Sequence, residues 1–245
     1  MDGQKMACTE PRGLIGCAVL RGAIEPLMYA ATDWDFVEFL DAGLHTTPTK
    51  LRPALQDRLD MITTPSRIFL AYGLCGNGLE GLRSGKHTLI IPRNGDCIPL
   101  LMGSYQQYAA DLQENPGTYY LSEGWLENDF HPIGQYSEWL QTYNEKTARR
   151  LLELYFKHYR RVLLLGYTKE ELDRGRNLAG EGAEFLGLAY AEKLSSPRYL
   201  QHLLKTGMDL TVSNEDLLLI PPGGETTSIM FIRELEHNHT AAGGK

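Results

Sequence analysis

Residues 67–92 read RIFLAYGLCGNGLEGLRSGKHTLIIP and contain two short, nearly continuous apolar runs, RIFLAYG (67–73) and HTLIIP (87–92). Such runs are typical of strands that are covered by helices on both faces. Before and after them, further short apolar runs alternate with segments of helical periodicity, which is the pattern of an α/β fold with a largely parallel sheet. The sequence therefore predicts a Rossmann-like α/β protein with a mostly parallel sheet.

The remaining predicted elements follow the same alternation. The other strands are predicted at GLIGC (13–17), WDFVEFL (34–40), TYYLSEGW (118–125), RRVLLLGY (160–167), AYAEKL (189–194) and LLLIPPGG (217–224). Helices are predicted at 19–30, 50–62, 98–112, 169–187 and 197–207, where apolar residues recur at helical spacing. These elements are enough for two small α/β units.

The chain is predicted to divide into two α/β halves. Residues 13–131 form the N-terminal half, which carries the candidate site, and residues 132–232 form the C-terminal half. The amphipathic stretch QYSEWLQTYNEKTARRLLELYFKHY (135–159) predicts a long helix that joins the halves. The remaining ends, 1–12 and 233–245, are expected to be flexible tails.

Composition restricts the class of protein. The 245 residues are 42% hydrophobic and 22% charged, which is ordinary for a folded globular protein. No apolar run reaches the roughly 18–20 residues that span a bilayer, and no secretory leader is recognised, so we expect a cytoplasmic protein. The net charge of −7 argues against nucleic-acid binding. Nothing in the composition decides between a monomer and a homo-oligomer.

Soft metal ligands recur where predicted strands end. Cys17 ends the first strand, His45 follows the second, Cys75 follows the third and Cys97 follows the fourth, whereas Cys8 lies in the leader. In open α/β sheets ligands bind beyond the carboxyl ends of the strands. Three thiolates and an imidazole make a tetrahedral zinc set, and three thiolates with an open position also suit a substrate-binding zinc or an iron–sulfur cluster. The alternative is that the cysteines simply pack in the core.

Two of these thiols have surroundings that favour a functional role. Cys75 and Cys97 each precede a predicted helix start, where unpaired N–H groups and the helix dipole lower the pKa of a thiol. We therefore expect thiolate character at both positions.

The loops around these thiols supply candidate ligand-binding residues. Gly76, Asn77 and Gly78 can turn backbone amides toward an anion and so form a small nest. Arg93 is a candidate for holding a carboxylate or phosphate beside the cysteines, although a surface arginine is the ordinary alternative. Asp96 either contacts a ligand or caps the helix that follows it.

The segment GNGLEG (76–81) also matches the glycine spacing of the dinucleotide fingerprint. The chain that follows it is too short for the crossover helix of the usual unit of about 30 residues. Nucleotide binding is therefore the weakest of the functional alternatives.

Several segments together resemble a known family. They are GCAVLRGAIEPL, GLHTTPTKLRPALQ, YGLCGNGLEGLRSGK, PRNGDCIPLLMGS, NPGTYYLSEGW and LLLIPPGG, spread over residues 13–224. In this order they are similar to the bacterial and archaeal domain-of-unknown-function family sixteen thirty-eight, which is encoded near corrinoid-dependent methylamine methyltransferases. The family pattern includes cysteines that match Cys17, Cys75 and Cys97 and a histidine that matches His45.

The resemblance implies a role in one-carbon metabolism. We expect a metal-binding protein, with zinc as the favoured metal, that supports corrinoid-linked methyl transfer; a corrinoid protein or a methyltransferase is the expected partner, and the corrinoid itself is carried by that partner. Whether the chain is itself an enzyme stays open. The alternative is a non-catalytic accessory protein that binds a corrinoid, its carrier protein or a small ligand between the two halves.

Overall fold

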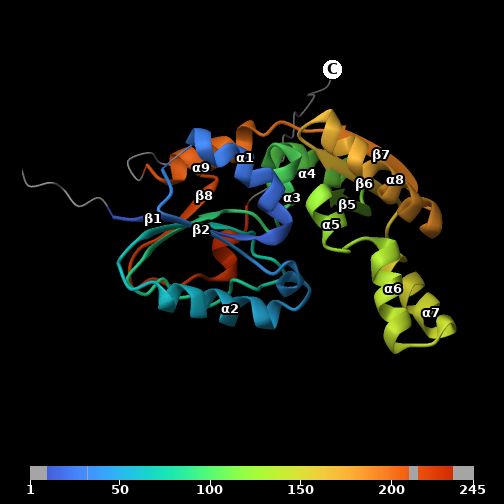
Figure 1. Ribbon diagram of the computed structural model, residues 1–245, viewed down its shortest axis with the longest axis horizontal. Coiled ribbons are helices and arrows are strands. Elements are labelled where there is room, and N and C mark those ends of the chain that lie inside the picture. Colours follow the sequence, from blue (N-terminus) through green and yellow to red (C-terminus); the bar gives the residue numbers. More distant parts are fainter. Residues whose placement is uncertain (1–9, 32, 210–214, 234–245) are drawn as a thin grey trace, which may run out of the picture.

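The computed structural model describes residues 10–31, 33–209 and 215–233, which form an α/β structure with two sheets (Figure 1). The larger sheet has the strand order β2-β1-β3-β4-β8, and the smaller has the order β5-β6-β7. The strands of the larger sheet are β1 (Arg12–Cys17), β2 (Phe36–Leu40), β3 (Arg67–Ala71), β4 (Thr88–Pro92) and β8 (Leu217–Ile220). All its pairings are parallel except that of β4 with β8. The predicted α/β class with a mostly parallel sheet is confirmed.

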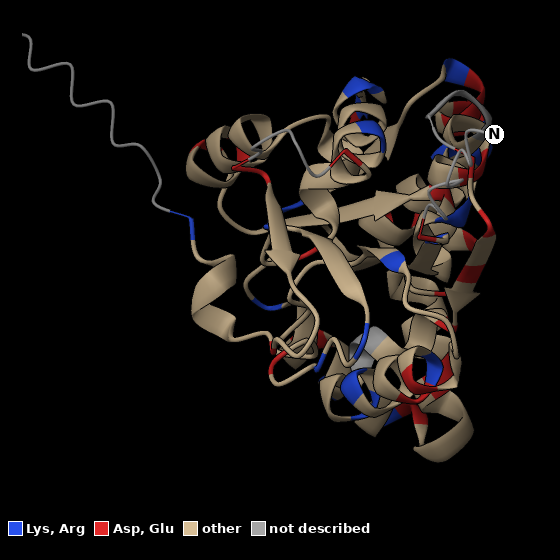
Figure 2. Ribbon diagram, turned by 90° about the vertical axis from the view of Figure 1, so that its left-hand side faces the viewer, with Lys and Arg blue, Asp and Glu red and all other residues tan. Residues whose placement is uncertain are grey.

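Helices cover both faces of the larger sheet, with α1 (Arg21–Ala31) and α9 (Arg198–Gly207) on one face and α2 (Pro48–Met61) on the other (Figure 1). The helix α2 begins with a proline, which suits the first helical position because its missing N–H has no partner there. Its leucines at positions 51, 55 and 59 are buried, as the helical spacing predicts. Figure 2 shows the result: charged residues lie mainly on helices and loops, and the central strands are almost wholly uncharged.

The smaller sheet consists of β5 (Thr118–Ser122), β6 (Arg161–Gly166) and β7 (Ala189–Leu194), and the helix α8 (Lys169–Leu186) packs on it. Because side chains alternate along a strand, β6 faces two cores. Val162 and Leu164 pack in a cluster with α8, whereas Leu163 and Leu165 join the core of the larger sheet.

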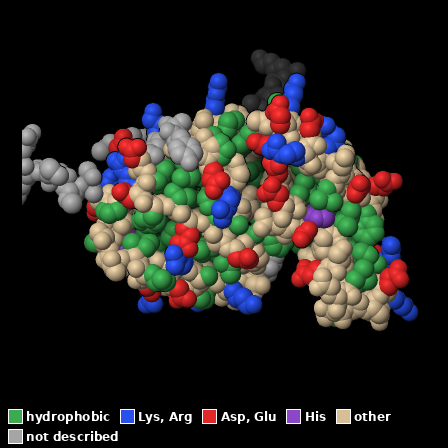
Figure 3. Space-filling model, in the orientation of Figure 1, with side chains coloured by type: hydrophobic (Ala, Val, Ile, Leu, Met, Phe, Trp, Pro, Cys, Tyr) green, Lys and Arg blue, Asp and Glu red, His purple; other side chains and the backbone are tan. Residues whose placement is uncertain are grey.

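The other helices are shorter. They are η1 (Ala18–Leu20), η2 (Ala42–Thr46), α3 (Ile98–Met102), α4 (Tyr105–Glu114), α5 (Glu123–Glu127), α6 (Pro132–Thr142), α7 (Glu145–Phe156) and η3 (Ser228–Phe231). α6 and α7 form a hairpin that projects from the smaller sheet (Figure 1). Within the described ranges, no helix is long and apolar enough to cross a membrane. On the face that Figure 3 shows, acidic and basic side chains are interspersed.

The predicted long helix over 135–159 is wrong, because the chain forms α6 and α7 with a break at Tyr143. Tyr143 has extended backbone angles, and the side chain of Asn144 accepts a hydrogen bond from the amide of Thr147 and so begins a new helix. The helix predicted over 98–112 is likewise two helices, α3 and α4. There Gly103 adopts the left-handed conformation with φ 96° and ends α3.

Sheet membership does not follow the predicted division into 13–131 and 132–232. β5 comes from the first of these ranges but pairs with β6, and β8 comes from the second but pairs with β4. Arg12 already begins β1, so the predicted tail 1–12 is too long. Residues 1–9 and 234–245 of the two predicted tails lie outside the described residues.

The connection between β3 and β4 runs through turns and holds the GNGLEG segment. Its Leu82 amide donates to the hydroxyl of the fully buried Thr226 at 3.0 Å, which ties the connection to the chain after β8. GNGLEG is followed by turns and not by a helix. Because the dinucleotide fingerprint needs a helix N-terminus for the pyrophosphate, this segment does not meet its requirement.

One histidine in the fold gives a pH-dependent stability. His87 is buried with Nε2 3.1 Å from the carbonyl oxygen of Leu59, and burial lowers its pKa below the usual 6.5. The imidazole of His87 therefore binds a proton more tightly in the unfolded chain than in the folded one. The contribution of neutral His87 to stability is complete above pH 6.5 and declines as the pH falls below it. We expect the urea midpoint of unfolding to fall between about pH 7 and about pH 5.5, and to fall less in His87→Gln. Equal pH dependence of the two proteins contradicts this assignment.

Candidate functional site

The larger sheet has a topological switch point between β1 and β3. The chain passes from β1 to β2 on one side, whereas β3 and β4 lie on the other. The crevice beyond the carboxyl ends of such strands is where open α/β sheets bind ligands. Cys17 is the last residue of β1, and Cys75 lies in the turn after β3. The candidate thiols therefore lie beside the position that the fold itself provides for a ligand.

The loops that carry Cys75 and Cys97 are bonded to each other. The amide of Leu74 donates to the carbonyl oxygen of Asn94 at 2.9 Å, and the amide of Cys75 donates to that of Gly95 at 3.0 Å. A Cβ atom on Gly73 would lie 2.5 Å from the backbone carbonyl of Asp96, so only glycine permits this approach. The two loops thus form one packed unit.

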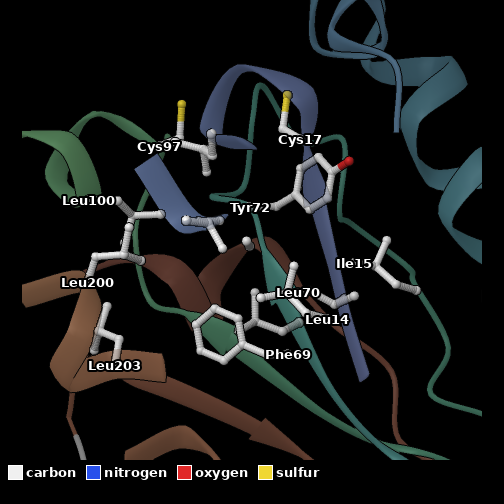
Figure 4. Close-up of a cluster of buried hydrophobic side chains, with 14 of the residues drawn as sticks. Leu14, Ile15, Cys17, Phe69, Leu70, Tyr72, Cys97, Leu100, Leu200 and Leu203 are labelled. Carbon is white, nitrogen blue, oxygen red and sulfur yellow. The ribbon is translucent and has the colours of Figure 1, made fainter. Parts of the chain in front are cut away.

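A buried tyrosine connects this unit to β1. Tyr72 is 1% exposed, and its hydroxyl donates to the carbonyl oxygen of Gly16 at 3.0 Å. Figure 4 shows Cys17 beside its ring, and the side chains of Cys17 and Cys97 pointing the same way, away from the layer of apolar side chains that includes Phe69. The pKa of Tyr72 is raised by burial and further by the charges of Cys17, Cys75 and Cys97. All three thiols therefore lie within electrostatic reach of one side chain.

The thiols also act on one another. Burial raises the pKa of Cys17 to about 11 and that of Cys75 to about 12. The pKa of Cys97 is raised well above its usual value, first by burial and then by Cys75, Asp96 and Cys17. The three cysteines are free thiols, and without a cation beside them they stay protonated at neutral pH.

The expected lowering of the pKa of Cys75 and Cys97 is wrong. Cys97 does precede the helix α3, but Cys75 precedes a turn. At both positions the loss of solvation outweighs any nearby amide dipole, because a buried thiolate lacks water and faces other negative groups.

Asp96 bonds to the first residue of the helix α3, close to the capping role that one of its two interpretations predicts, although the N-cap residue itself is Cys97. Its Oδ1 accepts a hydrogen bond from the amide of Ile98 at 2.9 Å, and its Oδ2 accepts one from the hydroxyl of Tyr108 at 3.0 Å. Burial raises the pKa of this carboxyl group. Asp96 thereby joins the Cys97 loop to the helix α4.

The predicted anion nest has an unusual backbone. Cys75, Gly76 and Asn77 have φ values of 49°, 61° and 68°, three successive left-handed residues. The amide of Gly78 donates to the carbonyl oxygen of Cys75 at 3.1 Å and is therefore used inside the turn. Gly76 and Asn77 are exposed. A ligand-binding role for Gly76, Asn77 and Gly78 stays a prediction.

The guanidinium of Arg93 is held by η3 and by the residue that follows it. Its Nε donates to the carbonyl oxygen of Met230 at 2.9 Å, and an Nη donates to that of Ile232 at 2.8 Å. These contacts give Arg93 a structural role, and its contact with a ligand beside Cys97 stays a prediction.

The backbone of His45 lies in η2, directly after β2, as predicted. η2 begins where Asp41 accepts a hydrogen bond from the amide of Gly43 at 2.7 Å. The side chain of His45 and the whole of Cys8 lie outside the described residues.

Whether this region can hold a metal ion depends on its donor atoms and on their geometry. Three thiols have the right chemistry for zinc or another soft metal. Among the side chains that the structure describes, however, no three His, Cys, Asp or Glu residues are placed to hold a metal ion. Cys17, Cys75 and Cys97 are therefore not arranged as a ready set of metal ligands in this structure.

Two residues of this region were missed by the sequence analysis. Tyr72 reads only as the end of an apolar run. Asn94 is 0% exposed, and neither its Oδ1 nor its Nδ2 has a hydrogen-bond partner among the described residues. The sequence signal for Asn94 was its position, because it is a polar residue between the end of a predicted strand and Cys97.

The fold and these loops define a class: an α/β protein with a mostly parallel sheet and free thiols at the carboxyl edge of that sheet. The chain belongs to the family described as protein of unknown function (DUF1638), whose model matches residues 39–204. The match includes His45, Cys75 and Cys97 and begins after Cys17. No curated protein and no solved structure matches the chain. The family resemblance drawn from the sequence is confirmed.

Proposed function

We propose that this protein binds a soft transition metal, with zinc favoured, through Cys17, Cys75 and Cys97. The observation that carries the proposal is the placement of three free thiols at the switch point of the sheet, one at the end of β1 and two on loops that are hydrogen-bonded to each other. Burying three thiols together leaves each of them a poor acid, and a coordinated cation removes this penalty by converting thiols to thiolates.

The structure also constrains how such a centre is held. Cys17 is fixed by a strand, and the two loops that carry Cys75 and Cys97 are fixed to each other by backbone hydrogen bonds. Tyr72 joins these parts through Gly16. We propose that rotation of the thiol side chains closes the ligand set and that His45 in η2 is the fourth ligand.

We further propose that the centre supports corrinoid-linked methyl transfer in the cytoplasm, the setting that the family resemblance implies. A bound zinc with one replaceable ligand holds a substrate thiol as the thiolate, which is the form that accepts a methyl group. The chain itself supplies the anchoring thiols and, through Asp96 and Tyr108, a fixed Cys97 loop.

Metal analysis of protein purified without an affinity tag tests the proposal. We expect about one equivalent of metal in the wild type and in the control Cys8→Ser, and less than about a tenth of an equivalent in Cys75→Ser. Circular dichroism establishes that the variants are folded. A wild-type content below about a tenth of an equivalent after anaerobic purification contradicts the proposal. A brown protein with visible absorption identifies an iron–sulfur cluster in place of zinc.

The alternative accessory function has a different physical requirement. A ligand of drug size needs a pocket of about 300–1,000 Å³, and a corrinoid needs more. A recess between the carboxyl ends of β5 and β6 and the η1–α1 segment has a volume of about 60 Å³. It therefore favours a much smaller ligand, and we expect no saturable binding of free cobalamin there.

A further inference from the structure

A recess lies between the smaller sheet and the η1–α1 segment, and none of the three thiols lines it. Its walls are the carboxyl ends of β5 and β6, the start of α8, α5, and the η1–α1 segment that follows Cys17. The close approach of α5 to η1 depends on Gly124, since a Cβ atom there would lie 2.0 Å from the carbonyl oxygen of Val19. The carboxyl ends of two strands of the smaller sheet therefore open into this recess, and the carboxyl ends of strands are the usual place for a ligand in α/β proteins.

The recess is acidic. Glu123, Glu127 and Glu171 line it. Arg174 pairs with Glu123 through two hydrogen bonds, one of them 2.7 Å long. The pKa of Arg174 is raised by Glu123 and also by the charges of Glu171 and Glu127, so all three carboxylates act electrostatically on a single guanidinium. Negative charge therefore exceeds positive charge at this place.

An unused hydroxyl group gives the second, independent observation. Ser122 lines the recess and occupies the N-cap position of α5, where a serine normally accepts a hydrogen bond from the helix backbone. Here it makes no such bond; the residue is 6% exposed, and its Oγ has no partner among the described residues. A buried hydroxyl without a partner is costly, so a ligand or water is expected to satisfy it.

Size and lining define the ligand. A water-sized group needs about 10–15 Å³ of such volume, so a recess of about 60 Å³ has room for roughly four to six of them. Val19 and Leu165 supply apolar surface beside the carboxylates. No described group of carboxylates is placed to hold a metal ion, which favours an organic cation.

We propose that this recess binds a small protonated amine of three to five heavy atoms. Its charge faces Glu171 and Glu127, one N–H donates to the Oγ of Ser122, and its carbon atoms contact Val19 and Leu165. The amide of Tyr167 donates to Oε2 of Glu171 at 2.7 Å, which fixes that carboxylate in the wall of the recess.

Isothermal titration with ethylammonium chloride tests the proposal, with ethanol as the neutral probe and sodium chloride as the ionic-strength control. We expect saturable binding of ethylammonium alone. Glu171→Gln, which retains an oxygen for the Tyr167 amide, is expected to weaken binding about tenfold or more, and Ser122→Ala several-fold. The control Glu170→Gln, on the same turn of α8 but outside the recess, is expected to bind like the wild type.

Three results overturn the assignment: no saturable binding of ethylammonium, equal binding of ethanol, or unchanged affinity in Glu171→Gln. Should Glu171→Gln fail to fold, Glu127→Gln at the exposed rim replaces it, with the same direction expected. The inference does not depend on the metal centre, because Cys75→Ser is expected to lose metal and to keep ethylammonium binding.

Discussion

Gly73→Ala is expected to lower the free energy of unfolding by about 3 kcal/mol or more. The new methyl group would lie 2.5 to 2.6 Å from the backbone C, O and Cα atoms of Asp96. These atoms belong to the backbone, so no flexible side chain can move aside. The two loops must separate, and the hydrogen bonds from Leu74 to Asn94 and from Cys75 to Gly95 are strained or lost. Urea unfolding followed by circular dichroism measures the change.

Gly95→Ala provides the matched control. Gly95 lies in the opposing loop and is exposed, and a Cβ atom there would have no atom within 4 Å. We expect its free energy of unfolding to stay within about 0.5 kcal/mol of the wild type. Equal stability of the two variants would show that the loops around Cys75 and Cys97 are not packed as described. If the proposed metal centre exists, Gly73→Ala also reduces the metal content, whereas Gly95→Ala leaves it unchanged.

The sequence predicted most strands because their apolar runs are local signals. β3, β4 and β6 lie within the predicted stretches, and β1 begins one residue before its own. The breaks between helices were missed because amphipathic periodicity continues across them, while Gly103 and Asn144 change the backbone locally. Strand order was missed for a different reason. The pairings of β5 and β8 are non-local, and no local pattern specifies which sheet receives a strand.

The edge of the sheet that carries the thiols could be predicted, because parallel strands direct their carboxyl ends to one side. Their electrostatics could not. The pKa of a thiol depends on burial and on charges that residues remote in sequence supply. The pKa of Cys97, for example, is raised by burial and by Cys75 and Cys17. The unpartnered amide of Asn94 and the left-handed backbone of Cys75 are likewise properties of the assembled loops.

Asp111→Ala is expected to destabilise the protein by about 3–5 kcal/mol, because it leaves a largely buried arginine without its counter-ion. Asp111 on α4 accepts hydrogen bonds of 2.8 and 2.7 Å from an Nη of Arg161 on β6. It also accepts one of 2.6 Å from the hydroxyl of Tyr120 on β5. Both charged side chains are less than a fifth exposed, at 18% and 19%.

Asp173→Ala is the control for this prediction, since Asp173 pairs with Arg176 in an exposed i,i+3 pair. Such pairs contribute little, and no measurable change in the urea midpoint is expected. Replacing both buried partners, in Asp111→Leu with Arg161→Met, is expected to recover part of the loss, because no charge is then left unpaired. If Asp111→Ala unfolds at the same urea concentration as the wild type, the ion pair does not hold α4 on the smaller sheet.

The position of Asp111 explains why this loss reaches beyond the smaller sheet. One turn earlier on α4, Tyr108 donates to Asp96 beside Cys97, and the Tyr108 and Tyr120 rings lie 5.8 Å apart between their centroids. A single helix face thus joins the Cys97 loop to β5 and β6. Releasing α4 from Arg161 is therefore expected to loosen the Cys97 loop as well. The amide of Ile98 donates a hydrogen bond to Asp96, so faster hydrogen exchange of this amide is the measurement that detects the loosening.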